Sequence, residues 1–278
     1  MVKIIETPRD GFQALPNFID TDRKIEYINQ LLKCGFDTVE VGSFVSPRVI
    51  PQMADTAKVL ESIDIDNTDS DIAVLAVTKK GADIAIQFDQ VDQIFFPFST
   101  SPTFLKRNTK QTVEEAYQIA EYIQNLCVKH NKKQVMFFSM GFESAYGDEW
   151  SIELMLNWIR RFKKIGLDTF PISDILGDTS AEQINKVFSA FVAEFPELEF
   201  GLHLHALADS QVAKVDAAYK AGIRRFDTVI NGLGGCPQTG RELVNNLPLQ
   251  VLLEYLNANN YTHTLNMQEV AKATEYLF

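Results

Sequence analysis

Short β-rich runs alternate with helical patterns along the 278 residues of this chain, and this alternation constrains its fold more than any other feature. The runs are rich in β-branched and aromatic residues, whereas the segments between them carry apolar residues at helical spacing. Strands that alternate with helices form a parallel sheet covered by the helices, and eight such units close into a (β/α)8 barrel. The expected strands lie at residues 2–6, 37–41, 72–77, 92–97, 133–139, 168–173, 199–205 and 225–230.

Helical patterns between these runs support the same architecture. The clearest of them cover Arg23–Lys33, Glu114–Lys129, Ile152–Lys164 and Ala181–Glu194. The residues after Asn246 are expected to hold the eighth helix and, around Met267–Leu277, a short extra helix. Because no Pro/Gly/Ser-rich linker interrupts the alternation, we predict an α/β protein with one catalytic domain over residues 1–278, a (β/α)8 TIM barrel with a short C-terminal extra helix.

The composition narrows the class of ligand and the compartment. The formal net charge of −11 disfavours a nucleic-acid surface, which needs basic patches to neutralise phosphates. Cys34, Cys127 and Cys236 are too few and too scattered for a disulfide framework and indicate a reducing compartment. The sequence shows no signal peptide and no apolar run of the roughly 20 residues that span a bilayer. We therefore expect a cytoplasmic protein that acts on small molecules, with neither nucleic acid nor membrane as a partner.

A pair of histidines, His203 and His205, ends the seventh expected strand. Alternate residues of a strand point to the same face, so both imidazoles can bind one cation from a fixed backbone. A layer inside such a barrel is normally filled by branched aliphatic residues, and two polar rings there would each need partners. A metal site is therefore favoured over the alternative, in which the two rings are ordinary inward-facing core residues.

Polar segments follow the first and last expected strands, which neighbour the seventh strand in a closed barrel. Asp10 follows the first strand, and Asn246 follows the last. Each also has an ordinary structural interpretation, Asp10 as a turn residue and Asn246 as a helix N-cap. Two imidazoles, a carboxylate and an amide without a thiolate favour Mg²⁺ or Mn²⁺, although imidazole also accepts zinc or iron.

Four further residues stand where barrel enzymes carry their chemistry, at the C-terminal ends of strands. Arg9 is placed to stabilise developing oxyanion charge, and Glu40 and Asp178 are candidates for acid/base or supporting roles. Cys236 lies in a glycine-rich loop with a proline behind it, which suits a mobile thiol. Cys34 and Cys127 fall in helical patterns and are expected to be structural.

Several segments of the chain together resemble the 3-hydroxy-3-methylglutaryl-CoA (HMG-CoA) lyases, a family of metal-dependent barrel lyases related to Claisen condensing enzymes. The Arg-Asp-Gly and His-x-His pieces are shared across that wider group, whereas the Ser-Phe-Val-Ser-Pro and Gly-Gly-Cys-Pro pieces point to the lyases. The matching segments are Pro8–Gln13, Val39–Pro47, Val49–Met53, Phe104–Asn108, Gly177–Thr179, His203–His205 and Gly232–Pro237.

The resemblance implies a role for each matching residue. It assigns the metal ligands to Asp10, His203, His205 and Asn246, the catalytic groups to Arg9, Cys236, Glu40 and Asp178, and coenzyme A contacts to Arg48 and Asn108. It also implies a homodimer that takes an acyl-CoA substrate in leucine degradation. The implied reaction is a retro-Claisen cleavage of HMG-CoA to acetyl-CoA and acetoacetate. A base, Asp10 or Asp178, removes the hydroxyl proton, Arg9 stabilises the enolate and Cys236 protonates it.

The chain departs from the lyase pattern at two places. Residues 206–209 replace an Asp-Thr-x-Gly run after the second histidine, which removes a polar group beside the metal. The last ligand lies in a changed context, so it could be Asn245 rather than Asn246. These departures keep a related hydroxyacyl-CoA open as the substrate. The sequence also leaves open a synthase that condenses acetyl-CoA with a 2-oxo acid, a group that usually has a longer C-terminal region, and a non-catalytic acyl-CoA-binding barrel.

Overall fold

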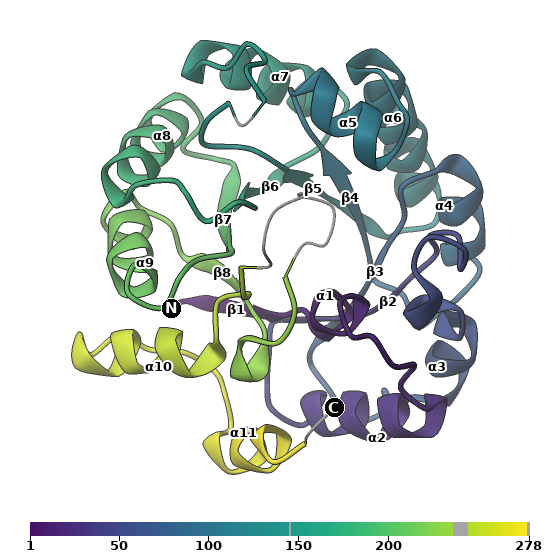
Figure 1. Ribbon diagram of the computed structural model, residues 1–278. Coiled ribbons are helices and arrows are strands. Elements are labelled where there is room, and N and C mark those ends of the chain that lie inside the picture. Colours follow the sequence, from purple (N-terminus) through teal and green to yellow (C-terminus); the bar gives the residue numbers. More distant parts are fainter. Residues whose placement is uncertain (145, 236–243, 277–278) are drawn as a thin grey trace.

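The computed structural model describes residues 1–144, 146–235 and 244–276, and its strands form a closed barrel (Figure 1). Each strand pairs in parallel with its neighbours in chain order, and β8 pairs with β1. The predicted α/β barrel is therefore confirmed, with every expected strand present. The strands are β1 (Lys3–Glu6), β2 (Thr38–Ser43), β3 (Asp71–Leu75), β4 (Gln93–Phe98), β5 (Lys133–Phe138), β6 (Thr169–Asp174), β7 (Glu199–Leu204) and β8 (Arg225–Thr228).

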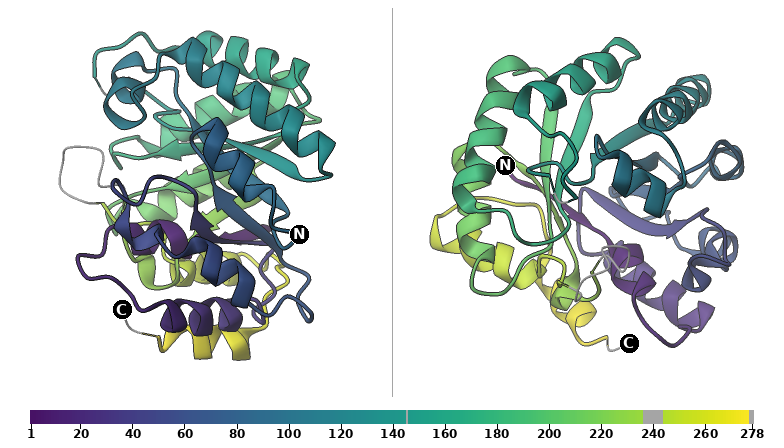
Figure 2. Two further views of the ribbon diagram at one scale, coloured as in Figure 1. Left: turned by 90° about the vertical axis from the view of Figure 1, so that its right-hand side faces the viewer. Right: turned by 45° about the horizontal axis from the view of Figure 1, so that its top comes forward.

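Helices surround the barrel and cover the outer face of its strands (Figure 2). Several begin at hydroxyl caps that their sequences predict; Thr112, for example, forms a capping box with Glu115. The expected extra helix is present as α11, which packs against α2. The helices and short 3₁₀ turns are α1 (Pro8–Gln13), α2 (Thr21–Leu31), η1 (Pro51–Met53), α3 (Thr56–Ser62), α4 (Lys79–Ala85), α5 (Pro102–Asn108), α6 (Val113–Lys129), α7 (Ile152–Lys164), α8 (Ala181–Glu194), α9 (Gln211–Lys220), η2 (Ile230–Gly232), α10 (Leu249–Ala258) and α11 (Met267–Thr274).

Helix α1, which carries Arg9 and Asp10 directly after β1, was not predicted from the sequence. The chain turns into a helix of six residues at Pro8, whose fixed φ suits the first helical position. Six residues are too few for an apolar repeat, which explains why periodicity did not reveal this helix. Its consequence is that Arg9 and Asp10 lie on a rigid element over the barrel mouth.

The interior of the barrel has two walls of opposite character. The inward side chains of β1 and β3–β5 form an apolar cluster separate from the main core between strands and helices. We call it the apolar wall; its members are Ile5, Ala73, Phe95, Val135 and Phe137. Opposite it, the inward positions of β7 and β8 form a charged wall made of Glu199, His203, Arg225 and Asp227.

No helix among the described residues is long and apolar enough to cross a membrane. Cys34 and Cys127 are buried, as expected for structural cysteines.

Candidate active site

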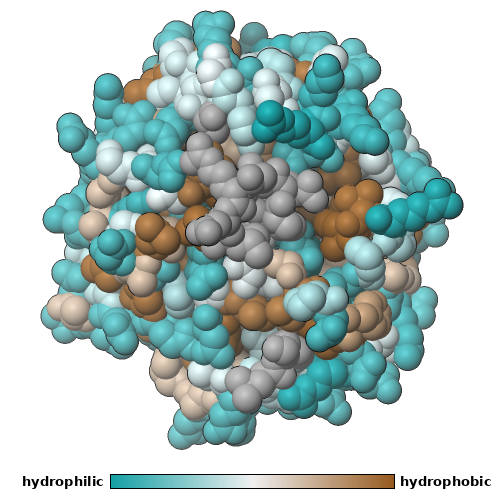
Figure 3. All heavy atoms as spheres, in the orientation of Figure 1, coloured by the Kyte–Doolittle hydropathy of each residue, from teal (hydrophilic) through white to brown (hydrophobic). Residues whose placement is uncertain are grey.

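A pocket opens at the C-terminal mouth of the barrel, and its lining includes three of the four expected metal ligands, Asp10, His203 and His205. Apolar residues surround the mouth within a largely hydrophilic face of the molecule (Figure 3). The pocket therefore combines the polar groups of the expected site with an apolar lining. Its lining is Arg9, Asp10, Gln13, Val45, Val49, Ile50, Leu75, Val77, Pro97, Phe104, Leu105, Asn108, Thr109, Phe137, Ser139, Ser173, Ile175, His203 and His205.

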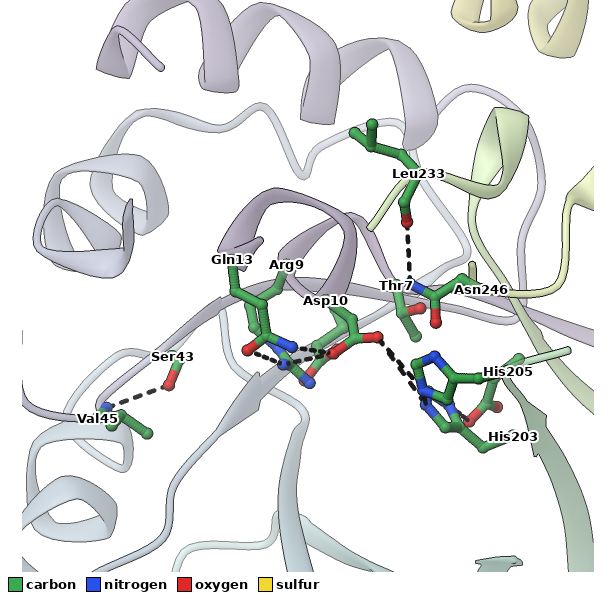
Figure 4. Close-up of polar contacts among 12 residues, drawn as sticks. Thr7, Arg9, Asp10, Gln13, Ser43, Val45, His203, His205, Leu233 and Asn246 are labelled. Atoms are coloured by element: carbon green, nitrogen blue, oxygen red, sulfur yellow. Dashed lines mark hydrogen bonds and ion pairs between the residues drawn. The ribbon is translucent and has the colours of Figure 1, made fainter. Parts of the chain in front are cut away.

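Asp10, His203 and His205 converge on one point (Figure 4). The two Nε2 atoms of the imidazoles are 3.2 Å apart. The Oδ2 atom of Asp10 is 3.9 Å from Nε2 of His203 and 4.0 Å from Nε2 of His205. The alternation of side chains along β7 and the short helix α1 thus bring three potential ligand atoms together, as the sequence predicted.

The outer nitrogen of each imidazole has its own partner, which turns the Nε2 atoms toward the shared point. Nδ1 of His203 lies 3.2 Å from Oδ2 of Asp227, and Nδ1 of His205 lies 3.3 Å from the carbonyl oxygen of Val244. Both acceptors favour a proton on Nδ1, which leaves Nε2 with a lone pair for a metal.

The pKa values of the two imidazoles shift in opposite directions. Burial, reinforced by the neighbouring His203, lowers the pKa of His205 to about 4. Burial also acts to lower the pKa of His203, but the hydrogen bond and charge of Asp227, together with the charges of Asp10 and Glu40, outweigh it and raise that pKa. A proton shared between the rings, or a cation that displaces it, satisfies the two facing nitrogens. Oδ2 of Asp10 is buried with no hydrogen-bond partner within the described part of the chain, which fits a ligand position for a divalent cation.

Arg9 lies beside this point and links two carboxylates. Its Nε and Nη2 donate to Oε1 of Glu40 at 2.9 and 2.7 Å, and its Nη1 donates to Oδ1 of Asp10 at 3.0 Å. Burial raises the pKa of Glu40 to about 7 despite the arginine. For Asp10, burial acts to raise the pKa, but Arg9 and the imidazoles outweigh it and hold that pKa below its usual value. The site thus holds Asp10 ionised and Glu40 near the point of protonation.

The structure brings Asn246, rather than Asn245, to the triad. Asn246 is buried and forms an isolated bridge with His205, whereas Asn245 is exposed. Its Nδ2 donates to the carbonyl oxygen of Leu233 at 2.9 Å, which leaves the amide oxygen on the side of the imidazoles (Figure 4). Asn246 is therefore placed where a fourth ligand is expected.

The remaining predicted site residues differ in position. Asn108 lines the pocket, and its buried Oδ1 has no partner among the residues described. Arg48 and Asp178 are exposed and do not line the pocket. The nearby Asp174 is buried but faces α9, where its Oδ2 accepts from Lys214 at 2.8 Å. Cys236 lies outside the described residues.

Two residues near the triad were not found from the sequence. Asp227 pairs with His203 in the register of β7 and β8, so it required the strand pairing to be known. Gln13, one helical turn after Arg9, accepts from Nη1 of Arg9 at 3.1 Å, and the unrecognised helix α1 concealed that spacing.

Together, the closed barrel and the convergent ligands define a TIM-barrel enzyme with a candidate metal site at its C-terminal mouth. The chain belongs to the HMGL-like family, whose model matches residues 1–277, and it is a lyase of that family. The predicted resemblance to the HMG-CoA lyases is thereby confirmed.

Curated relatives and solved structures agree over most of the chain. The hydroxymethylglutaryl-CoA lyase YngG of Bacillus subtilis is 30% identical over 83% of this chain and 76% of its own length. The human mitochondrial hydroxymethylglutaryl-CoA lyase is 27% identical over 99% of this chain and 84% of its own. A crystal structure of B. subtilis HMG-CoA lyase superposes with a TM-score of 0.92 at 27% identity, covering 99% of this chain and 91% of that one.

A second solved structure records a ligand. The HMG-CoA lyase of Acinetobacter baumannii, in complex with coenzyme A and 3-methylmalate, has a TM-score of 0.91 at 26% identity and covers 99% of this chain and 89% of its own.

Proposed function

We propose that this lyase cleaves HMG-CoA to acetyl-CoA and acetoacetate by a retro-Claisen reaction that depends on Mg²⁺ or Mn²⁺. The observation that carries the proposal is the convergence of Asp10, His203 and His205 in the pocket. Oδ2 of Asp10 lacks a hydrogen-bond partner among the described residues, and Arg9 lies beside the three ligands. Similarity to HMG-CoA lyases along nearly the whole chain supports the substrate class. Coenzyme A in the A. baumannii complex supports an acyl-CoA substrate.

Asp10, His203, His205 and Asn246 would hold the cation. When bound, a divalent cation supplies Lewis-acid stabilisation of negative charge on substrate oxygens. The ligand atoms of the aspartate and the two histidines lie within 4.8 Å of one another, and nitrogen and oxygen donors of this kind fit Mg²⁺ or Mn²⁺.

The chain's own residues carry the proton and charge movements. A base takes the C3 hydroxyl proton, the bond between C2 and C3 breaks, and the electron pair passes to the thioester as an enolate. Of the two candidate bases, Asp10 lines the pocket and the exposed Asp178 does not, so the geometry favours Asp10. Arg9, held by Glu40, then stabilises the enolate oxygen.

Cys236 is the proposed proton donor to the enolate carbon, on the strength of the family resemblance and its place in the glycine-rich segment after β8. Asn108, whose Oδ1 has no partner within the described chain, is the better supported of the two proposed coenzyme A contacts, because the other, Arg48, does not line the pocket.

A related hydroxyacyl-CoA remains a second candidate substrate because of one observation. The pocket is lined mainly by apolar side chains beyond the triad, including Leu75, Pro97 and Phe137. That surface suits an apolar substituent at C3, and a substituent longer than methyl would bury additional surface.

Product analysis tests the proposal directly. Protein freed of metal with a chelator is incubated with HMG-CoA, with and without Mg²⁺ or Mn²⁺, and acetyl-CoA and acetoacetate are quantified. We expect both products in equal amounts and only with the cation. His205→Ala should lose cation binding and turnover while its far-UV circular dichroism stays unchanged.

Three results would contradict this assignment. They are full turnover in protein shown to be metal-free, cleavage only of a longer 3-alkyl analogue, and net condensation of acetyl-CoA with a 2-oxo acid. The second result would retain the reaction and change the substrate, whereas the third would replace the reaction.

A further inference from the structure

Arg225 is a buried arginine inside the barrel, two residues before Asp227, the carboxylate that contacts His203. Its side chain is 5% exposed, and it projects from β8 into the charged wall. Layers inside such barrels are normally filled by branched aliphatic side chains, and a buried cation is costly unless it is paired. A guanidinium at this position is therefore unusual and indicates a structural or functional role.

The neighbouring strand leaves space for this side chain. Gly201 on β7 stands opposite Arg225 in the strand register. A Cβ atom at Gly201 would lie 2.8 Å from Cδ and 3.0 Å from Cγ of the arginine, closer than such atoms approach in practice. The glycine at this inward position is thus explained by the arginine stem that lies across it.

The guanidinium connects the bottom of the barrel to the metal triad. Its Nη1 donates to Oε1 of Glu199 at 3.4 Å, and its Nε lies 3.7 Å from Oδ1 of Asp227. The other oxygen of Asp227, Oδ2, accepts from Nδ1 of His203 at 3.2 Å. Asp227 is completely buried in this arrangement, and Arg225 is the cation beside its second oxygen.

We propose that Arg225 is a positioning residue for the metal ligand His203, acting through Asp227. The guanidinium attracts Oδ1 of Asp227 across an ion pair of 3.7 Å, and the carboxylate fixes the imidazole with Nε2 directed at the triad. The inference rests on the metal site proposed above, and it assigns a function to a buried charge that the cleavage reaction does not use.

The test measures Mn²⁺ affinity rather than turnover, so it separates this inference from the choice of substrate. Free Mn²⁺ is followed by electron paramagnetic resonance in titrations of wild type, Arg225→Met, Arg225→Lys and Asp227→Asn. Loss of a supporting residue behind a ligating histidine typically weakens binding roughly 10- to 100-fold, and we expect Arg225→Met to fall in that range. Arg225→Lys, which keeps the positive charge, should recover part of the affinity.

Lys24→Met is the matched control. Lys24 is also a buried cation paired with a carboxylate, Asp55, but it lies on α2 outside the barrel wall. It removes the same charge, and we expect wild-type Mn²⁺ affinity. The double variant Arg225→Met/Asp227→Asn should bind no more weakly than Asp227→Asn alone, because the arginine acts through that carboxylate.

Gly201→Ala tests the same inference if Arg225→Met does not fold. This variant keeps the arginine, but the added methyl group displaces the arginine side chain. It should weaken Mn²⁺ binding by a smaller factor. Wild-type affinity in every folded variant of Arg225 and Gly201, or an equal loss in Lys24→Met, would overturn the inference. Wild-type protein that binds Mn²⁺ without cleaving HMG-CoA would instead contradict the proposed substrate and leave this inference standing.

Discussion

The apolar wall and the charged wall of the barrel interior differ in their contacts within the described chain: the first is well packed, and the second contains polar atoms without hydrogen bonds. On the apolar wall, Phe95 and Phe137 pack with ring centroids 4.9 Å apart, and the cluster is buried. On the charged wall, and at Asp10 beside it, buried atoms lack hydrogen-bond partners among the residues that the structure describes, although Arg225 and Asp227 form an ion pair at 3.7 Å. Each such atom lowers the free energy of unfolding by about 1–3 kcal/mol, so a contribution to stability does not explain why these residues are present.

The apolar wall stabilises the fold by packing, whereas the charged wall places Asp227 behind the triad residue His203. Phe137 joins the two walls, because it packs edge-on against His203 with ring centroids 5.6 Å apart. Functional sites are the places where local rules of folding are broken and compensated elsewhere. Here the buried apolar residues of the apolar wall and the main core supply the stability that offsets the buried polar groups.

Arg9→Gln changes the triad that the charged wall supports, because Arg9 donates to Asp10, and it should have the largest effect. Turnover is expected to fall by about 10²-fold or more, with a smaller change in KM, because the arginine acts on charge that develops only in the transition state. Steady-state kinetics with HMG-CoA and Mn²⁺ provide the measurement. Arg160 on α7, whose side chain is 36% exposed, is changed to Gln as the control for loss of one positive charge.

The Arg9→Gln fold should survive, because the pKa of Glu40 is already raised to about 7 by burial and the carboxyl can protonate when its partner is lost. A variant with raised KM and unchanged kcat would show that Arg9 only binds substrate and does not stabilise the transition state.

Phe95→Leu tests the opposite wall, because this ring is buried there and does not line the pocket. Removal of part of a buried ring should lower the free energy of unfolding by about 1–2 kcal/mol, measured by urea denaturation, through lost transfer energy and residual space. Turnover should change only a few-fold, and Mn²⁺ affinity should stay at the wild-type value. If Mn²⁺ affinity fell as far as in Arg225→Met, the two walls would not be independent.

Glu6→Gln should have the smallest effect on turnover and a clear effect on stability against pH. Glu6 on β1 accepts from the Thr228 hydroxyl at 2.9 Å and the Ile230 amide at 2.7 Å, and burial raises its pKa from 4.5 to about 8. A carboxyl with a raised folded-state pKa favours folding below its unfolded pKa, and stability is lost as pH rises through the folded value.

The wild type should therefore lose stability relative to Glu6→Gln between about pH 4.5 and pH 8, as measured by urea denaturation at each pH. Parallel curves for the two proteins would show that Glu6 keeps an ordinary pKa. A large loss of turnover in Glu6→Gln would show that charge outside the two walls also serves the site.

Much of the architecture follows from local pattern. The alternation of strands and helices identified every strand of the barrel, because periodicity is a property of neighbouring residues. The His203 and His205 pair was recognised as a shared ligand face for the same reason, since residues two apart on a strand share a side. The six-residue helix α1 was not predicted, because it is too short to show a helical repeat of apolar residues.

The sequence by itself determined the barrel, the imidazole pair and the side of the barrel that carries polar groups. The tertiary structure alone decided that Asn246 lies at the triad, that Asp227 supports His203 across the register of β7 and β8, and that Gly201 makes space for Arg225. These contacts join residues far apart in the chain, and they depend on how the strands align when the barrel closes. Local spacing cannot encode that alignment, because it is set by the packing of the whole sheet.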